Sequence, residues 1–340
     1  MKRDIISSIK ISSSFLGSLI GAGFASGQEV MIYFGAFGRA GGAGVAVCAA
    51  LLFGLVSGVC LILYKTGARD FYELLKIACG RAAARVFSAV FLSFSFIAFG
   101  VMAAGFGESV SEHLGADRRI GALLFLIIMA LVMRAGERGV VAVNVALAPV
   151  MTAAALFVSV FILCRGGISA SGPPPNAVGS AVLYAGYNAI LGVAVIAQLS
   201  HLVHSRRVGL ISALISSGAF GALIFVLWLL MTRNYAALSP HGIPMLYAAS
   251  TIHPVMGHVY FAALLMAMIT TGACCGFSVC GSLGLSMRRG AYLLPVCALP
   301  FIMFDFQALI ARLYSLFGIA GAALMLIVLF RAARLRARER

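Results

Sequence analysis

Ile20-Gly-Ala-Gly-Phe-Ala-Ser-Gly-Gln-Glu-Val30 is the stretch that decides the fold, and it lies inside the first long apolar segment. Gly21, Gly23 and Gly27 interrupt what is otherwise a membrane helix. Glycine destabilises a helix by about 1 kcal/mol relative to alanine and lets the backbone leave helical angles. Non-helical backbone at membrane depth is tolerated only where protein buries it or where it lines a wet cavity. The stretch therefore predicts a helix broken at its middle, with free backbone groups and the Glu29 carboxylate facing a ligand or an ion.

The composition excludes an ordinary soluble domain. Of 340 residues, 62% are hydrophobic and 10% are charged, and the mean hydropathy is +1.06. Apolar runs long enough to span a bilayer recur along the whole chain. The predicted fold is an all-α membrane protein with about ten transmembrane helices, near residues 10–34, 42–64, 83–107, 119–133, 139–164, 178–200, 208–231, 254–285, 289–304 and 308–330.

The basic residues predict the orientation of these spans. Most of the 25 lysines and arginines lie at the two ends and in alternate loops, including Lys65–Arg85. Because cytoplasmic loops carry the excess of Lys and Arg, both termini are predicted to be cytoplasmic and Pro173–Pro175 external. The net charge of +15 is not gathered on one face, so no nucleic-acid partner is predicted.

Several chemical classes lack their sequence signatures. The eight cysteines lie mostly inside apolar runs without metal-ligand spacing. Neither a Ser/His/Asp set nor a zinc-protease motif is visible. The glycine pattern at Gly21–Gly27 lacks the preceding strand that a dinucleotide-binding motif needs. No enzyme activity, organic cofactor or transition metal is therefore expected.

The sixth span carries a second interruption. Gly186, Asn188 and Gly192 lie centrally in it, with Tyr184 and Tyr187 on either side of the first glycine. Interrupted segments five spans apart predict two inverted five-span halves and a central transporter site. The alternative is that these glycines only permit close helix packing, as predicted for Gly54-x-x-x-Gly58 and Gly272-x-x-x-Gly276.

These features predict one membrane domain over residues 1–340. Residues 1–165 form the first five-helix repeat and 176–331 the second, inverted repeat. Residues 332–340 form a basic cytoplasmic tail that can contact anionic lipid. At the outer side, Glu108, Glu112 and Asp117 make the end of the third span acidic, and Asp305 is placed to pair with Arg312.

The chain resembles the LeuT-fold transporters of the amino acid/polyamine/organocation superfamily and, more narrowly, the uncharacterised YkvI-type bacterial membrane proteins. The string Gly21–Glu29 carries the narrower resemblance. About ten spans, two interrupted helices and a polar patch in the eighth span carry the wider one. The resemblance implies a five-plus-five inverted repeat with helices 1 and 6 broken, transport by alternating access, and a bacterial cytoplasmic (inner) membrane location.

The same resemblance implies a sodium site between the broken first span and the eighth. Its ligands are the backbone carbonyls of Gly21, Phe24 and Ala267 and the hydroxyls of Thr270 and Thr271. The alternative is that both threonines bond back to their own helix. Some proton-coupled relatives place a lysine of the fifth span at this site. Span 139–164 has no lysine, which favours sodium, while Glu29 leaves proton coupling open.

A substrate site is predicted on both sides of the break. The amides near Ala22, Gly23, Ala25 and Ser26 are expected to bind a carboxylate, because helix N-termini favour anions. Tyr184, Tyr187 and Asn188 are expected to line the opposite side.

Glu29 is expected to face this site, as the partner of a substrate ammonium or as a coupling carboxylate. A structural alternative places it near the outer end of its helix, reaching toward water.

The predicted function is a Na+- or H+-coupled symporter of a small amino-acid-like or zwitterionic solute. Two alternatives stay open, a passive channel or uniporter on the same scaffold and a transport-inactive membrane sensor or assembly protein. The expected partners are the solute and membrane lipid, and the sequence indicates no oligomeric state.

Overall fold

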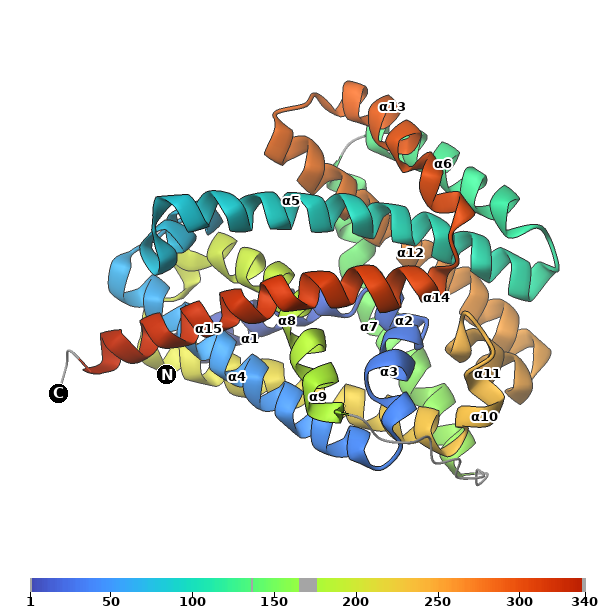
Figure 1. Cartoon of the computed structure of the whole chain (residues 1–340), viewed down its shortest axis with the longest axis horizontal. Helices are drawn as coiled ribbons and strands as arrows, with labels where there is room; N and C mark the ends of the chain where they lie inside the picture. The colour runs from blue at the N-terminus through green and yellow to red at the C-terminus, as the bar shows by residue number, and fades with distance from the viewer. Residues whose placement is uncertain (1, 136, 165–175, 338–340) are drawn as a thin grey trace.

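The computed structural model describes the backbone of residues 2–135, 137–164 and 176–337, and these residues form a bundle of helices without strands (Figure 1). Each predicted span coincides with a helix or a run of helices. The first five are α1 (Lys2–Leu19) with α2 (Ala22–Ala25) and α3 (Gln28–Tyr33), then α4 (Ala40–Thr66), α5 (Phe71–Leu114), α6 (Arg118–Ala135) and α7 (Glu137–Cys164). The second five are α8 (Ala177–Gln198), α9 (Arg206–Arg233), α12 (Pro254–Leu283), α13 (Met287–Ala298) and finally α14 (Phe306–Leu309) with α15 (Ser315–Ala337).

Short helices connect these spans. They are the 3-10 helices η1 (Gly35–Phe37), η2 (Ser200–Leu202) and η3 (Leu299–Met303), the α-helices α10 (Tyr235–Leu238) and α11 (Pro244–Ile252), and the π-helical turn η4 (Ile310–Tyr314). The connector Pro173–Pro175 lies outside the described residues.

Among the described residues, six helices are each long and apolar enough to cross a membrane: α4, α5, α8, α9, α12 and the run from α14 to α15. The first span falls outside this set because α1 is only 18 residues long and includes the charged residues Lys2, Arg3, Asp4 and Lys10. The all-α membrane fold predicted from composition is confirmed.

Helix α8 lies at the centre of the bundle. It packs against α1, α4 and α15, while α4 also packs against α9, and α5 against α12. Helices α6 and α13 pack together beside α5 as an outer layer (Figure 1). The start of α1 and the end of α15 lie at one end of the bundle, and α10 and α11 lie at the other, as an even number of crossings requires (Figure 1).

The predicted break in the sixth span is wrong, because α8 runs without interruption from Ala177 to Gln198. A Cβ added at Gly186 would overlap the carbonyl oxygen of Gly318 on α15, and one at Gly318 would lie 2.5 Å from the carbonyl oxygen of Leu183. These glycines therefore let two helix backbones touch, which is the packing alternative.

The other polar and glycine positions of α8 also serve the helix itself. A Cβ added at Gly192 would overlap the Phe15 ring of α1. The Asn188 amide donates to the carbonyl oxygen of Tyr184 at 3.0 Å, one turn earlier in the same helix. Asn188 therefore has its partner without any unwinding of the backbone.

The basic segment 65–85 is largely helical, because α5 begins within it at Phe71. Asp70 caps α5 by accepting from the Glu73 amide at 2.8 Å. Gly80, with φ 86°, then separates a short first helix from the long spanning part of α5. The positive φ explains why a glycine stands at this bend.

Candidate functional site

The break in the first span is built from two glycines with different backbone conformations. Gly21 is extended, with φ −93° and ψ −175°, and precedes the four-residue helix α2. Gly27 is left-handed, with φ 80°, and precedes α3. A Cβ at Gly27 would lie 2.6 Å from the side chains of both Met231 and Met245. The predicted break is therefore confirmed, and its second half requires glycine for conformation and for space.

Distant segments hold the broken chain in place. The Tyr260 hydroxyl of α12 donates to the carbonyl oxygen of Ala25 at 2.6 Å. The Met245 amide, at the start of α11, donates to the carbonyl oxygen of Ser26 at 3.0 Å. These bonds satisfy carbonyl groups that the break removes from the helical ladder, and they place α11 directly on the break.

Glu29 lies in the first turn of α3 and is enclosed by protein, with 6% of its surface exposed. The Tyr187 hydroxyl of α8 donates to its Oε2 at 2.5 Å. The other carboxylate oxygen lies against Gly23, where an added Cβ would overlap it. Glu29 is therefore in the protein interior, in contact with both sides of the predicted site, and does not reach water at the end of its helix.

Aromatic rings form a wall around this carboxylate. Tyr33, Tyr184 and Tyr187 have ring centroids 5.3–5.8 Å apart. Phe94 of α5 and Tyr314 of η4 lie 6.0 and 4.9 Å from the Tyr187 ring. The faces of aromatic rings attract cations, and so does the carboxylate of Glu29 beside them.

Gln28 is a further candidate site residue, for which the sequence predicts no role. Its side chain is fully buried, and neither its amide nitrogen nor its amide oxygen has a hydrogen-bond partner among the described residues. A buried amide without partners costs free energy, so such groups mark places where a ligand or water belongs. The signal available in the sequence is its position beside Glu29 inside an apolar segment.

The predicted cation ligands are brought together in part. Gly21 lies against Thr271, since an added Cβ would be 3.6 and 3.7 Å from its Cγ2 and Oγ1 atoms. The Thr270 hydroxyl instead donates to the carbonyl oxygen of Ala267 at 3.1 Å, within α12, as the alternative reading of the threonines expects. The carbonyl of Phe24 accepts from the Gly27 amide at 3.0 Å and keeps a second lone pair.

The predicted carboxylate-binding amides divide into two groups. The amides of Ala25 and Ser26 donate to the carbonyl oxygens of Gly21 and Ala22 at 3.0 and 2.8 Å, so the expectation that they are free is wrong in this conformation. Ala22 and Gly23 are the first residues of α2, where helix geometry offers no intrahelical acceptor for the N–H groups. They remain the candidates for an anion.

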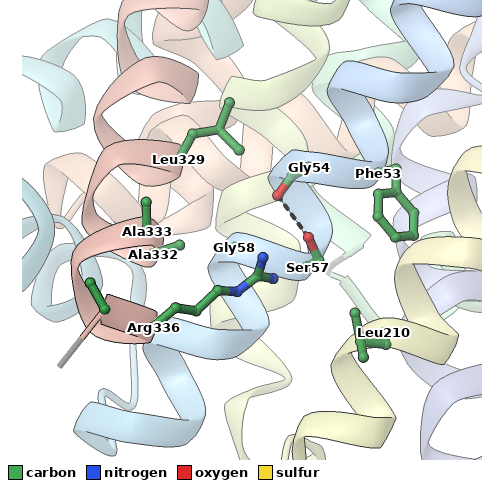
Figure 2. A pocket seen from close by; sticks show the side chains of 10 residues that line it. Phe53, Gly54, Ser57, Gly58, Leu210, Leu329, Ala332, Ala333 and Arg336 are labelled. Carbon is green, nitrogen blue, oxygen red and sulfur yellow. Dashed lines mark hydrogen bonds between the residues drawn. The ribbon is translucent and has the colours of Figure 1, made fainter. Parts of the chain in front are cut away.

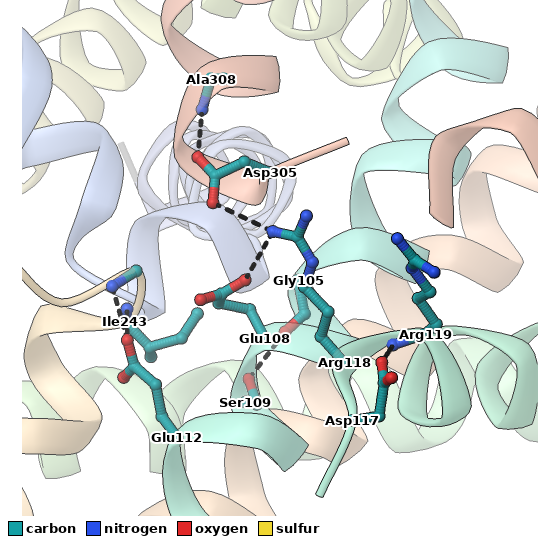
Figure 3. A network of polar contacts seen from close by, with 11 residues as sticks. Gly105, Glu108, Ser109, Glu112, Asp117, Arg118, Arg119, Ile243, Asp305 and Ala308 are labelled. Carbon is teal, nitrogen blue, oxygen red and sulfur yellow. Dashed lines mark hydrogen bonds and ion pairs between the residues drawn. The ribbon is translucent and has the colours of Figure 1, made fainter. Parts of the chain in front are cut away.

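A network of charged groups lies where α5 ends and α6 begins (Figure 3). The Arg118 guanidinium is 3.5 Å from the carboxylate of Asp305 and 4.0 Å from that of Glu108. The predicted Asp305–Arg312 pair is therefore wrong, because Asp305 faces α6 and also caps α14 through the Ala308 amide at 3.0 Å.

The same network reaches the segment that covers the break. Glu112 accepts from the amides of Gly242 and Ile243 at 2.5 and 3.2 Å, just before α11 begins (Figure 3). Asp117 accepts from the Arg119 amide at 2.8 Å. Among the described residues, no group of three or more histidine, cysteine or acidic side chains is placed to hold a metal ion.

Comparison with known sequences gives two similar proteins of Bacillus subtilis (strain 168). The uncharacterised membrane protein YkvI is 28% identical over 208 residues, which cover 59% of this chain and 60% of YkvI. The match thus spans less than two thirds of YkvI. The uncharacterised protein YyaD is 26% identical over 332 residues, covering 92% of this chain and 94% of YyaD. No protein-family model matches the chain.

Solved structures share the fold at low sequence identity. MhsT in complex with L-phenylalanine matches with a TM-score of 0.63 and 17% identity, over 93% of this chain and 87% of MhsT. Mhp1, a nucleobase-cation-symport-1 family transporter, matches with a TM-score of 0.56 and 13% identity, over 88% of this chain and 73% of Mhp1. The manganese transporter of Eremococcus coleocola matches with a TM-score of 0.55 and 15% identity, over 95% of this chain and 76% of the transporter. The predicted resemblance is confirmed: the chain is similar in sequence to YkvI and YyaD, and it has the fold of the LeuT-type transporters.

Proposed function

We propose that this protein is a secondary active transporter, a Na+- or H+-coupled symporter that moves a small amino-acid-like or zwitterionic solute by alternating access. The observation that carries the proposal is the enclosed Glu29 carboxylate at the break of the first span, bonded to Tyr187 of α8. Support comes from the shared fold, since Mhp1 and the manganese protein are named as transporters and MhsT is in complex with L-phenylalanine.

The substrate class follows from two groups that lie side by side. Glu29 supplies negative charge for an ammonium group. Gly23, which faces the same carboxylate, is the second residue of the short helix α2, where the first N–H groups have no acceptor within the helix. A solute that satisfies both needs opposite charges a few bonds apart, as in an α-amino acid.

The coupling ion has one candidate site for each alternative. Contact between Gly21 and Thr271 supports a sodium site between the break and α12. Glu29, the enclosed carboxylate, is the candidate for carrying a proton.

Uptake into proteoliposomes tests the proposal. A solute is first identified by thermal stabilisation of the purified protein across a panel of amino acids and other zwitterions. Its accumulation is then measured with an inward sodium gradient, with an inward proton gradient, and with neither. Accumulation above the outside concentration under one gradient is the expected result.

Two outcomes would replace this proposal with an alternative. Equilibration without accumulation under every gradient would indicate a uniporter or channel. Specific binding without any flux would indicate a sensor or assembly protein that has kept the transporter fold.

A further inference from the structure

A groove lies on the outside of the bundle, away from the candidate substrate site. It is formed by α4, α9 and α15, and its volume is about 470 Å³ (Figure 2). That volume falls within the range of sites that hold small organic molecules. The groove is therefore large enough for a ligand and is separate from the Glu29 site.

Small residues shape the floor of this groove. Gly54 and Gly58 of α4 face α15, where added Cβ atoms would be 3.0 Å from Leu329 and 3.3 Å from Val328. The rim is apolar and open, with Phe53 38% exposed and Leu210 49% exposed. The hydroxyl of Ser57 is already bonded to the Gly54 carbonyl at 3.1 Å, so the floor favours a hydrocarbon chain.

One end of the groove carries a positive charge. Arg336 of α15 lines it, and Figure 2 shows its guanidinium directed toward α4 beside Gly58. Arg336 is exposed and has no ion-pair partner within the described part of the chain. No acidic side chain is among the residues that line the groove. A guanidinium in this position is suited to bind a phosphate group.

The two ends of the groove lie at different depths. Arg336 is close to the end of α15, where Arg331 and Arg334 also lie. Leu329 is seven residues earlier in the same helix, which places it roughly 10 Å farther from that end at 1.5 Å per residue. The exposed Leu326 and Phe330 mark the surrounding face of α15 as apolar. A molecule that fits both ends has an anionic head and an apolar chain.

We propose that this groove binds an anionic phospholipid of the leaflet on the side where the chain begins and ends. One acyl chain lies along Gly54 and Gly58, and the phosphate is bound by Arg336. Basic pockets between helices on the predicted cytoplasmic side are suited to anionic head groups. The site is independent of the proposed transport activity, because none of its residues contacts the Glu29 site.

Native mass spectrometry of the purified protein tests this proposal. The protein is equilibrated with equal amounts of phosphatidylglycerol and phosphatidylcholine of the same acyl chains, and the retained lipid is counted. The wild type is expected to retain the anionic lipid preferentially. Arg336→Gln is expected to reduce that preference about fivefold, corresponding to about 1 kcal/mol for one basic residue near a membrane surface.

Arg334→Gln is the matched control. Arg334 has the same charge on the same helix, but its guanidinium lies 4.3 Å from the Phe330 ring and does not line the groove. It is expected to leave the preference unchanged. Ala333→Leu fills the groove from an exposed position and is expected to reduce retention of both lipids.

Four outcomes would overturn the proposal. Arg336→Gln could keep the wild-type preference, or Arg334→Gln could lower it equally, which would indicate diffuse electrostatics. Inorganic phosphate or glycerol phosphate could displace the lipid at equal concentration, which would indicate a small-anion site. A dimer without bound lipid would indicate that a second copy of the chain covers the groove. Melting temperatures of all variants show whether each is folded, and Arg336→Gln tests the proposal even if Ala333→Leu does not fold.

Discussion

Glu29 is the residue on which the proposed function depends most directly. Glu29→Gln keeps the size of the side chain and an oxygen that can accept from Tyr187, so the folded protein is expected to survive. The substitution removes the negative charge of the carboxylate, which would bind a substrate ammonium group or carry a coupling proton. We expect concentrative uptake to fall to the level of empty liposomes while the melting temperature changes by only a few degrees.

Tyr187→Phe provides a graded comparison. It removes the hydroxyl that donates to Glu29 at 2.5 Å but leaves the charge. A hydrogen bond to a charged group contributes about 1.5–3 kcal/mol, so uptake is expected to be reduced rather than lost. Normal uptake by Glu29→Gln, with an unchanged ion and pH dependence, would make Glu29 structural.

Gly23 is predicted to be intolerant of any side chain, because an added Cβ overlaps the Glu29 carboxylate. Gly23→Ala is therefore expected to displace Glu29 and to lower both uptake and melting temperature. Gly17→Ala is the control, since no atom lies within 4 Å of a Cβ at that position of the same span. Equal behaviour of the two variants would show that Gly23 has no special relation to the carboxylate.

The sodium hypothesis is tested by the stability of the purified protein. Binding to the folded state raises stability by RT ln(1 + [L]/Kd), about 2.7 kcal/mol at 100-fold saturation. Sodium is expected to raise the melting temperature relative to choline at equal ionic strength. Thr271→Ala is expected to weaken this effect more than Thr270→Val, because only Thr271 lies against Gly21. Identical melting curves in sodium and choline at every pH would refute the hypothesis.

At the residue scale, the sequence predicted the polar character of the site better than its contacts. Glu29 and Tyr187 were both expected at the centre, and the structure joins them. The bond from Tyr260 to Ala25 links residues 235 positions apart, and no local pattern predicts such a contact. The engagement of the Ala25 and Ser26 amides likewise depends on how α2 closes, which glycine content does not determine.

At the scale of elements, the same signal had two different outcomes. Glycines lie in the middle of both the first and the sixth spans, but only the first span departs from a continuous helix. Gly27 has a left-handed backbone, whereas Gly186 keeps a helical one and touches the backbone of α15. The difference arises from the partner helix, where Gly318 and Gly321 face α8, and a partner 130 or more residues away is not visible in the span itself.

The α8–α15 contact is predicted to tolerate no added methyl group. Gly186→Ala places a Cβ onto the Gly318 carbonyl, and overpacking of this kind costs typically about 1–3 kcal/mol. The melting temperature in detergent is expected to fall clearly. Gly218→Ala on α9, where a Cβ would meet nothing within 4 Å, is expected to change it little. A stable Gly186→Ala variant would mean that the two helices separate easily at this point.

At the scale of the whole molecule, hydrogen bonds hold α11 and the segment before it against the break and against α5. Tyr260 and Met245 bond to the break, and Glu112 holds the segment before α11. The alternating access proposed above would require the side of α11 to open while the other closes, so these contacts are the ones that such a motion would have to separate. The bundle around α8 can stay intact, because its glycine contacts with α15 are backbone to backbone.

The orientation of the whole chain gives the last prediction. Positive charge predicts that the segment 65–85 is cytoplasmic and that the segment 232–254 is external. Ala82 and Ala236 are exposed alanines in these two segments. Single cysteines at these positions, in a background lacking the eight native cysteines, are expected to react with a membrane-impermeant maleimide from opposite sides. Cysteine at the fully buried Ala249 is the control and is expected to react from neither side. Labelling of positions 82 and 236 from the same side would require an even number of crossings between them, so the assignment of α5 to α9 as five successive spans would have to change.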